Sequence, residues 1–242
     1  MCFYCAQSKK ALELAKRYGR KSNIIEMAQE VLNEQYKINA FAHPVCAIVT
    51  ENESIVTAQW GLIPAWIKTS TDAAKMSKMC LNARSETVFE KPVFKGIHSK
   101  RCLLPVTGYF EFQHTTNGVL PYYIFLRDED IFSLGGIIET WQKPETKETI
   151  QTFTILTTAA NSLCAKIHNG GKNPHRMPVI VGKENEEIWL DKSLNENDIK
   201  LFFRSYDDGK MDAYQVVRDF MKRNDKTVIE RLTKSDVSLE FL

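Results

Sequence analysis

The sequence predicts an α+β protein built as one β-rich domain. Short β patterns separated by turn residues dominate residues 45–181, whereas helical periodicity is confined to residues 1–36 and to segments after residue 183. No repeat, low-complexity stretch or linker divides the 242 residues. Strands in the middle with helices towards both ends are typical of an α+β fold, so we expect a single domain over residues 1–242.

The amino-terminal part predicts two helices. Apolar residues recur at helical spacing over residues 11–18 and again over residues 24–36, and Ser8 and Ser22 precede the two runs as candidate N-caps. Gly19 ends the first run, so we expect a helical hairpin. Its cations are expected to form a solvated face, with phosphate contact as the alternative: Lys9, Lys10, Arg17, Arg20 and Lys21.

The rest of the domain predicts strands. We expect them at residues 45–50, 54–60, 101–106, 108–113, 121–127, 131–138, 150–158 and 179–181. Because only three polar residues separate the first two, they predict a hairpin. Peripheral helices are expected at residues 184–190 and 195–206, before a polar tail.

Composition limits the class of protein. Hydrophobic residues make up 43% and charged residues 26% of the chain, which is typical of a soluble globular protein. There is no apolar run that could span a bilayer and no secretory signal, so we expect no membrane partner and a cytoplasmic, nucleoid-associated location. The six cysteines are spread too thinly for a disulfide framework, which favours reduced thiols. A net charge of +2 neither requires nor excludes nucleic acid.

The first two residues, Met1-Cys2, predict unusual chemistry. Aminopeptidases remove an initiator Met before a small side chain, so Cys2 is expected to carry both a free α-amine and a thiol. Such a 1,2-aminothiol forms an imine with an aldehyde and then closes through sulfur to a thiazolidine. The α-amine has a pKa of about 7.7–8.0, so part of it is unprotonated near neutral pH. A chance Met-Cys start is the alternative, and the C-x-x-C of Cys2 and Cys5 predicts no metal or redox site.

Two polar or aromatic stretches are candidate nucleic-acid contacts. Residues 60–66 place two indoles around a glycine and a proline, which suits stacking against bases; the alternative puts Trp60 in the core and leaves Trp66 as the candidate for exposure. Residues 82–87 are too polar for core and rich in donors for phosphate or sugar oxygens. A capped helix start, with Arg84 and Glu86 paired at the surface, is the alternative for the second stretch.

A third stretch, residues 108–113, contains a candidate proton-transfer group. Glu111 lies between Phe110 and Phe112, and a carboxyl among aromatics has its pKa raised by desolvation. A strand glutamate that faces water is the alternative. Farther on, His168 and His175 bring imidazoles near a possible site, although a lone histidine is more often structural.

Taken in order, these motifs resemble the SRAP (SOS-response-associated peptidase) family of abasic-site processing proteins. The resemblance is strongest over residues 1–181 and includes W-G-L-I-P-x-W at 60–66, N-A-R-S-E-T at 82–87, R-C-L-L-P-V-x-G-Y-F-E-F at 101–112, T-x-A-N at 158–161, and I-H with R-M-P between 167 and 178. It implies a central barrel-like mixed or antiparallel sheet and a basic groove. It also implies binding of single-stranded DNA, particularly at junctions with duplex, and trapping of abasic sites as a thiazolidine.

The resemblance implies a role for each matched residue. Cys2 supplies amine and thiol, Glu111 shuttles protons, and His168 helps to open the sugar ring. The remaining contacts to lesion, phosphate or stacked bases are implied for Asn82, Arg84, Thr158, Arg176, Trp60, Pro64 and Trp66. Lys95, Lys100 and Arg101 are candidates for a phosphate grip. Autoproteolytic removal of Met1, DNA crosslinking chemistry, no cofactor, no metal and a monomeric state complete the expectation.

The chain departs from the family pattern in two places. Phe3-Tyr4 replace the usual Gly-Arg after the cysteine, and residues 169–175 separate His168 from Arg176 where the family has one residue. We assign the catalytic role to His168 because it keeps its spacing to Thr158, with His175 as the reserve. Two other classes stay open: an amidohydrolase that uses Cys2 to attack an amide, and a noncatalytic single-strand-binding module.

Overall fold

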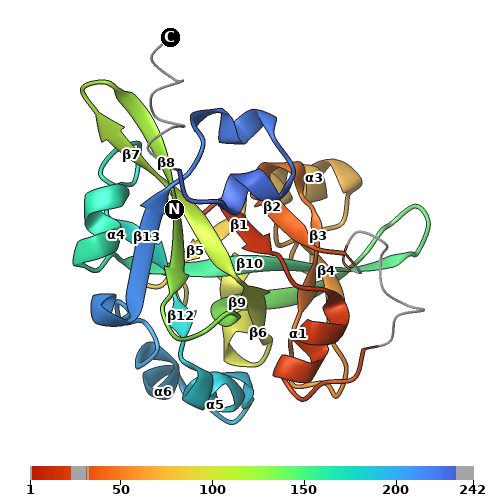
Figure 1. Cartoon of the computed structure of the whole chain (residues 1–242). Coiled ribbons are helices and arrows are strands. Elements are labelled where there is room, and N and C mark those ends of the chain that lie inside the picture. Colours follow the sequence, from red (N-terminus) through yellow and green to blue (C-terminus); the bar gives the residue numbers. More distant parts are fainter. Residues whose placement is uncertain (1, 23–30, 32, 233–242) are drawn as a thin grey trace.

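The computed structural model describes residues 2–22, 31 and 33–232, which form two β-sheets with helices around them (Figure 1). The first sheet is antiparallel in the order β13-β8-β7-β1-β2. Its strands are β1 (Tyr4–Gln7), β2 (Gln35–Asn39), β7 (Gly108–Thr115), β8 (Gly118–Leu126) and β13 (Met211–Gln215). Because β1 lies between β2 and β7, the chain just after Cys2 is held in the middle of this sheet.

The second sheet is mixed. Along β12-β9-β10-β4-β3, strand β10 runs parallel to β4 and antiparallel to β9, while β5 and β11 pair with β10 and β6 pairs with β9. Its strands are β3 (Val45–Ile48), β4 (Val56–Trp60), β5 (Asn82–Arg84), β6 (Arg101–Val106), β9 (Phe132–Gln142), β10 (Thr149–Ala159), β11 (Arg176–Pro178) and β12 (Ile180–Val181). The α+β, sheet-rich class is thus confirmed; among the described residues the sheets are not closed into a barrel.

Helices lie around the sheets. They are α1 (Ala11–Arg17), α3 (Ser70–Met79), α4 (Ser162–Ile167), α5 (Glu186–Leu190) and α6 (Glu196–Lys200), with 3₁₀ turns at Ala40–Ala42, Pro92–His98, Lys183–Asn185, Asp208–Lys210, Arg218–Lys222 and Lys226–Ile229. None of the described helices has the length and apolar character needed to cross a bilayer.

The amino-terminal prediction needs two corrections. Ser8 is not the N-cap of α1: the helix begins at Ala11, and Lys10 is at its N-cap position. The Ser8 hydroxyl lies 2.8 Å from the Thr107 hydroxyl instead. Residues 35–39, which overlap the end of the predicted second helix, form β2 because they pair with β1. Residues 24–30 and 32 of that predicted helix lie outside the described residues.

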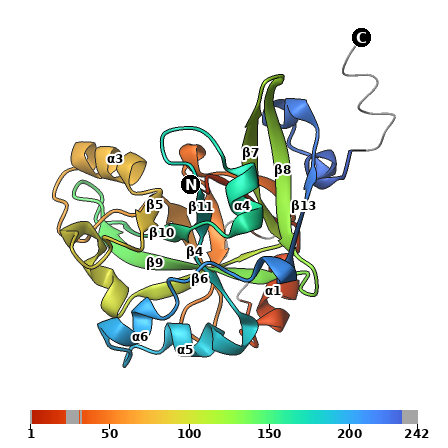
Figure 2. The ribbon, with the colours of Figure 1, turned by 90° about the vertical axis from the view of Figure 1, so that its left-hand side faces the viewer.

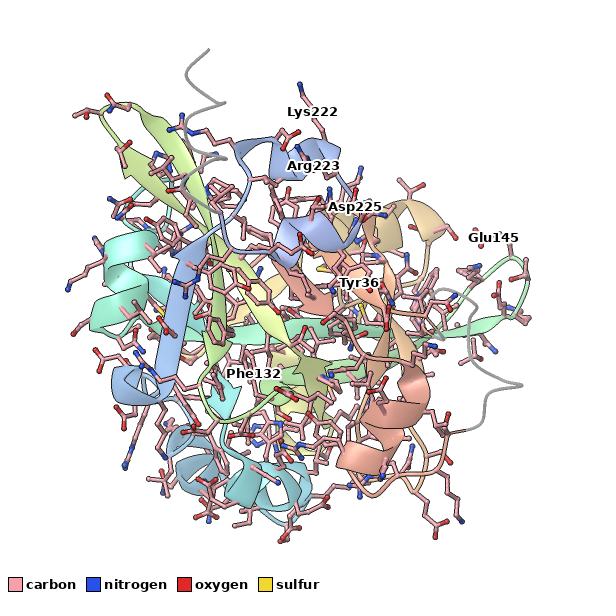
Figure 3. The ribbon with its side chains drawn as sticks, viewed as in Figure 1. Tyr36, Phe132, Glu145, Lys222, Arg223 and Asp225 are labelled. Carbon is pink, nitrogen blue, oxygen red and sulfur yellow. The ribbon has the colours of Figure 1, made fainter. Side chains whose placement is uncertain are left out.

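The segment after β13 also differs from the predicted polar tail. Phe220 is fully buried and packs against Tyr4 and Phe110, with ring centroids 5.6 and 4.5 Å away. Lys37 on β2 donates to the carbonyls of Phe220 and Met221, each at 3.1 Å. Figure 3 labels Lys222, Arg223 and Asp225 in this part of the chain and Tyr36 on β2 below them, and β2 contacts the turn Lys226–Ile229. This segment therefore covers one face of the first sheet.

The core between the two sheets contains the amino-terminal cysteine. Tyr109 and Ile124 of the first sheet pack with Leu134 and Phe153 of the second, and Cys2 belongs to the same buried cluster. Figure 2 shows β7, β8 and β13 standing across β9 and β10, with α4 beside β7. The start of the described chain is thus anchored where the sheets meet.

Candidate active site

Cys2 is buried immediately before β1. None of its surface is exposed, and its thiol lies 3.8 Å from the Tyr4 carbonyl oxygen. Burial raises the pKa of the thiol well above its ordinary value, and the nearby Glu111 carboxylate raises it further. The sulfur is therefore protonated at neutral pH, and any reaction through it needs a proton acceptor.

Glu111 lies on β7, one residue beyond Phe110, which is paired with Tyr4 of β1. Its side chain is on the same face of β7 as that of Tyr109, and only 3% of the residue is exposed. Burial raises the pKa of the Glu111 carboxyl to about 7. A carboxyl that titrates near neutral pH can both donate and accept a proton.

His168 follows α4 and faces Glu111. Its Nε2 lies 3.9 Å from a carboxyl oxygen of Glu111, and its Nδ1 lies 3.0 Å from the Arg176 carbonyl oxygen. Burial lowers the pKa of His168 to about 4, so the imidazole is neutral at pH 7. His175, the reserve candidate, is exposed and has left-handed backbone with φ 56°. The structure therefore places His168 at Glu111.

A cavity of about 350 Å³ opens onto this pair. Glu111 and His168 are among its polar lining residues, and much of the remaining wall is aromatic. The aromatic lining residues are Phe3, Tyr4, Phe110 and Phe112. Residues 170–173, in the segment that separates His168 from Arg176, line it as well. A substrate could thus reach the carboxyl and the imidazole through this opening.

Tyr109 and Cys164 were not among the candidate residues. The Tyr109 hydroxyl and the Cys164 sulfur are 3.1 Å apart, and both groups are buried. The Glu111 carboxylate raises the pKa of each, although burial is the larger cause for both. Alternation along residues 108–113 already put Tyr109 on the Glu111 face, but nothing in the sequence pointed to its partner Cys164.

Asn82 and Arg84 lie on β5, which pairs with β10. Asn82 is opposite Ile155, so its side chain is on the face of the sheet where Ile155 packs in the cluster with Cys2. Both polar atoms of the Asn82 amide are shielded from solvent, yet neither has a hydrogen bond to any described residue. Such buried amides normally have partners, which makes Asn82 a candidate ligand contact. The Arg84 side chain is 49% exposed.

Arg176 is largely committed within the protein. Its guanidinium forms a bidentate ion pair with Glu86 and donates to the Thr157 carbonyl at 2.7 Å, and the residue is only 7% exposed. Glu86 is also 3.7 Å from Arg84. The predicted role of Arg176 in substrate or phosphate binding stays a prediction, and in this conformation Glu86 occupies the guanidinium.

Three further DNA-binding candidates are buried in this structure. Trp60 is fully buried and its indole donates to the Leu81 carbonyl at 2.7 Å, so it has no face for stacking. Pro64 is buried as well. Thr158 is 4% exposed and donates to the Phe203 carbonyl, on the face of β10 opposite Thr157. Within residues 60–66, Trp66 presents an exposed ring, with 54% of its surface accessible.

The expected basic grip and helix-face cations are mostly paired. Arg101 is buried and donates to the carbonyls of Ile97 and Trp189. These bonds connect β6 to the 3₁₀ turn Pro92–His98 and to α5. Lys100 pairs with Glu139 at 2.5 Å. On the α1 side, Arg17, Arg20 and Lys21 pair with Glu186, Glu187 and Glu53. Arg17, Arg20, Lys21 and Lys100 therefore have carboxylate partners rather than a free face.

Comparison with known proteins identifies the family. The profile of the SOS response associated peptidase (SRAP) family matches residues 1–223. The chain is 37% identical over 168 residues to the abasic site processing protein YoqW of Bacillus subtilis (strain 168), covering 68% of this chain and 70% of that one. It is 32% identical over 158 residues to the abasic site processing protein HMCES of Gallus gallus, covering 57% and 45%.

A solved structure agrees in fold over nearly the whole chain. The crystal structure of a protein from Bacteroides thetaiotaomicron superposes with a TM-score of 0.91 at 44% identity, covering 96% of this chain and 100% of that one. The family profile spans Cys2, Glu111 and His168. The chain therefore belongs to the SOS response associated peptidase family.

Proposed function

We propose that this protein binds single-stranded DNA and covalently traps abasic sites through Cys2. The observation that carries the proposal is the buried Glu111 carboxyl, which lies close enough to Cys2 to raise its thiol pKa and 3.9 Å from His168. The names of the curated relatives, abasic site processing proteins, support the same substrate. We further propose that the chain acts as one domain and as a monomer.

The reaction begins after Met1 is removed, which frees the α-amine of Cys2. The nitrogen adds to C1′ of the ring-opened deoxyribose, and the resulting carbinolamine loses water to give an imine. The Cys2 sulfur then adds to the imine carbon and the thiol proton ends on nitrogen, closing a thiazolidine. One water is released overall. Removal of Met1 by the protein itself would consume one water and would account for peptidase activity.

Each polar group has a step suited to its titration. Neutral His168 accepts the proton of the C1′ hydroxyl as the sugar ring opens. Glu111, with a pKa of about 7, gives a proton to the departing water and takes one from the thiol. Asn82 supplies the amide that holds the sugar, and Arg84 the cation that holds its phosphate. Trp66 offers the exposed ring for stacking at a junction.

Intact mass spectrometry tests the proposal. Protein mixed with a single-stranded oligonucleotide that carries one abasic site should gain the mass of the oligonucleotide minus one water, on a chain that lacks Met1. A variant that retains one extra residue before Cys2 should form no heat-stable adduct, because an amide nitrogen cannot form an imine. Undiminished adduct in that variant would eliminate the thiazolidine mechanism. A thioester with an amide substrate, without DNA binding, would instead indicate an amidohydrolase.

A further inference from the structure

The cavity at the active site is more aromatic than the trapping chemistry requires. Proton transfer and sugar binding use Glu111, His168 and Asn82, whereas Phe3, Tyr4 and Phe112 line the cavity with rings that have no part in those steps. At about 350 Å³, the cavity lies within the size range of small-ligand sites. Its composition therefore points to a flat, unsaturated group beside the reacting sugar.

The aromatic wall is held in place from behind. Phe112 packs edge-on against Tyr4 and Phe220, with ring centroids 5.8 and 6.0 Å apart. The ring centroids of Phe3 and Phe41 are 4.6 Å apart. Phe3 and Phe112 are only partly buried, so these supported rings keep some surface for a ligand. A wall of this kind needs little ordering when a base stacks on it.

A further part of the cavity wall comes from the segment between His168 and Arg176. The Asn169 side chain accepts from the His114 backbone N–H at 2.8 Å and donates to its carbonyl at 3.0 Å. Gly170 lies so close to His114 that a Cβ there would be 2.4 Å from the ring, and Gly171 has a positive φ of 84°. The segment is thus docked on β7 and carries Lys172 to the cavity.

Lys172 adds a positive charge at the mouth of this aromatic space. Its side chain is exposed, and none of the described residues forms an ion pair with it. An exposed cation beside aromatic faces complements a nucleotide, which presents an anionic phosphate and a flat base. An abasic residue has no base of its own to fill the cavity, so the occupant must come from a neighbouring nucleotide.

We propose that this cavity is a subsite for the nucleobase adjoining the abasic residue, with Phe3 and Phe112 stacking on the base and Lys172 contacting its phosphate. The inference rests on the proposed function, since it assumes that an abasic sugar reaches Glu111 and His168. It makes the protein selective for an isolated abasic residue with an intact neighbour over a run of missing bases.

Binding of two oligonucleotides tests the subsite. Both are single-stranded and carry a central tetrahydrofuran, an abasic analogue without an aldehyde; in the second, the two adjoining nucleotides are tetrahydrofurans as well. Because stacking on an aromatic side chain contributes about 1–3 kcal/mol per base, wild-type protein should bind the second roughly 10- to 100-fold more weakly in fluorescence anisotropy. Equal affinity for the two would overturn the subsite.

Variants then assign any preference to the cavity. Phe112→Leu should lose most of it, and Phe3→Leu provides an independent test if the first variant unfolds. Lys172→Ala should bind both oligonucleotides several-fold more weakly, with a salt dependence reduced by about one phosphate contact, whereas Lys166→Ala on the neighbouring helix serves as the matched control. A preference that both phenylalanine variants retain in full would show that the base is bound elsewhere and would overturn the proposal.

The outcome is separable from that of the proposed function. An adduct in the mass spectrum without any preference between the two oligonucleotides would overturn the subsite alone. A clear preference without an adduct would overturn the trapping reaction and leave the subsite standing, because the tetrahydrofuran oligonucleotides report binding and not chemistry.

Discussion

The reacting centre and the rim beside it treat their charged groups in opposite ways. At the centre, Glu111 and His168 are 3% and 8% exposed. Burial raises the pKa of Glu111 and lowers the pKa of His168, so it favours the neutral form of each. At the rim, Arg84 and Glu86 have side chains 49% and 44% exposed and stay charged as an ion pair. The centre is therefore suited to moving protons, and the rim to binding an anionic backbone.

This difference predicts which region affects the rate of trapping and which affects the affinity for DNA. A group out of water affects the barrier of a proton-transfer step, because its protonation state is set by its surroundings. An exposed ion pair contributes at most about 1 kcal/mol to stability, so Arg84 can exchange its 3.7 Å contact with Glu86 for a phosphate at little cost, while Glu86 stays paired with Arg176. Substitutions at the centre should change the rate of trapping, and substitutions at the rim should change affinity and its salt dependence.

The largest effect is expected for Glu111→Gln. The amide keeps the shape of the side chain but cannot transfer a proton, so the single-turnover rate of adduct formation should fall about 10²- to 10⁴-fold. Affinity for tetrahydrofuran-containing DNA should stay within about twofold. Quenched-flow gel analysis gives the rate, and anisotropy gives the affinity. A variant that traps at the wild-type rate would remove the carboxyl from the mechanism.

The two histidines give the next contrast. His168→Ala should slow adduct formation or reversal about 10²-fold, because it deletes the imidazole that faces Glu111, whereas the exposed His175→Ala should change either rate less than about threefold. Time courses of both variants on the same abasic oligonucleotide decide the ranking. The reverse ranking would mean that the histidine next to Arg176 is the catalytic one.

The raised pKa of Glu111 also predicts how stability depends on pH. Its folded value of about 7 lies above an unfolded value of about 4.3, so the folded state binds the extra proton between these limits. Stability from this group is fully present below about pH 4 and is lost as pH rises through 7. Relative to Glu111→Gln, the free energy of unfolding of the wild type should fall by about 2–3 kcal/mol between pH 5 and pH 8.

Urea denaturation of both proteins at the two pH values measures this difference. His168 is present in both, so its own opposite dependence, stability lost as pH falls from about 6.5 towards 4, cancels in the comparison. A difference that does not change with pH would mean that Glu111 ionises as it does in water.

Much of the fold was predictable where strands are buried on both faces. Residues 101–106 are an apolar run in the sequence and form β6 with the same bounds. By contrast, β5 is only three residues long and contains two polar residues, Asn82 and Arg84. It forms a strand because it pairs in parallel with β10. Helix α3 was not predicted, because Ala73 is the residue that it buries and no apolar periodicity marks it in the sequence. At its start, the Thr69 hydroxyl caps the helix by accepting from the Asp72 backbone N–H.

The site was predictable in its chemistry but not in its packing. The pKa of Glu111 is raised as predicted, although the cause is burial on the Tyr109 face of β7, whereas Phe110 and Phe112 lie on the other face. The burial of Thr158 and Arg176 could not be read from the motifs. Whether Thr157 or Thr158 faces the site depends on the register of β10, and the state of Arg176 depends on Glu86, which lies 90 residues away in the chain.

At the rim, Arg84→Ala should weaken binding without slowing chemistry. Loss of one exposed cation should reduce affinity for single-stranded DNA several-fold and lower the slope of log affinity against log salt by about one contact. At saturating DNA the trapping rate should be unchanged. Anisotropy titrations at several salt concentrations, with Lys166→Ala as the control, measure the slope. A rate defect that persists at saturation would place Arg84 in the reacting centre.

The smallest effect is expected for Trp66→Ala. Its ring is 54% exposed beside α3, so removal should leave the melting temperature nearly unchanged while weakening binding to a single-strand to duplex junction a few-fold more than to plain single strands. Leu12→Ala, which truncates an apolar side chain on α1 that is 63% exposed, is the control for a nonspecific loss of surface. If Trp66→Ala weakens both DNA forms equally, the indole stacks on single strands and has no special part at the junction. If it weakens neither, the rim binds DNA through its charges alone, and the contrast between centre and rim becomes one of proton transfer against electrostatics.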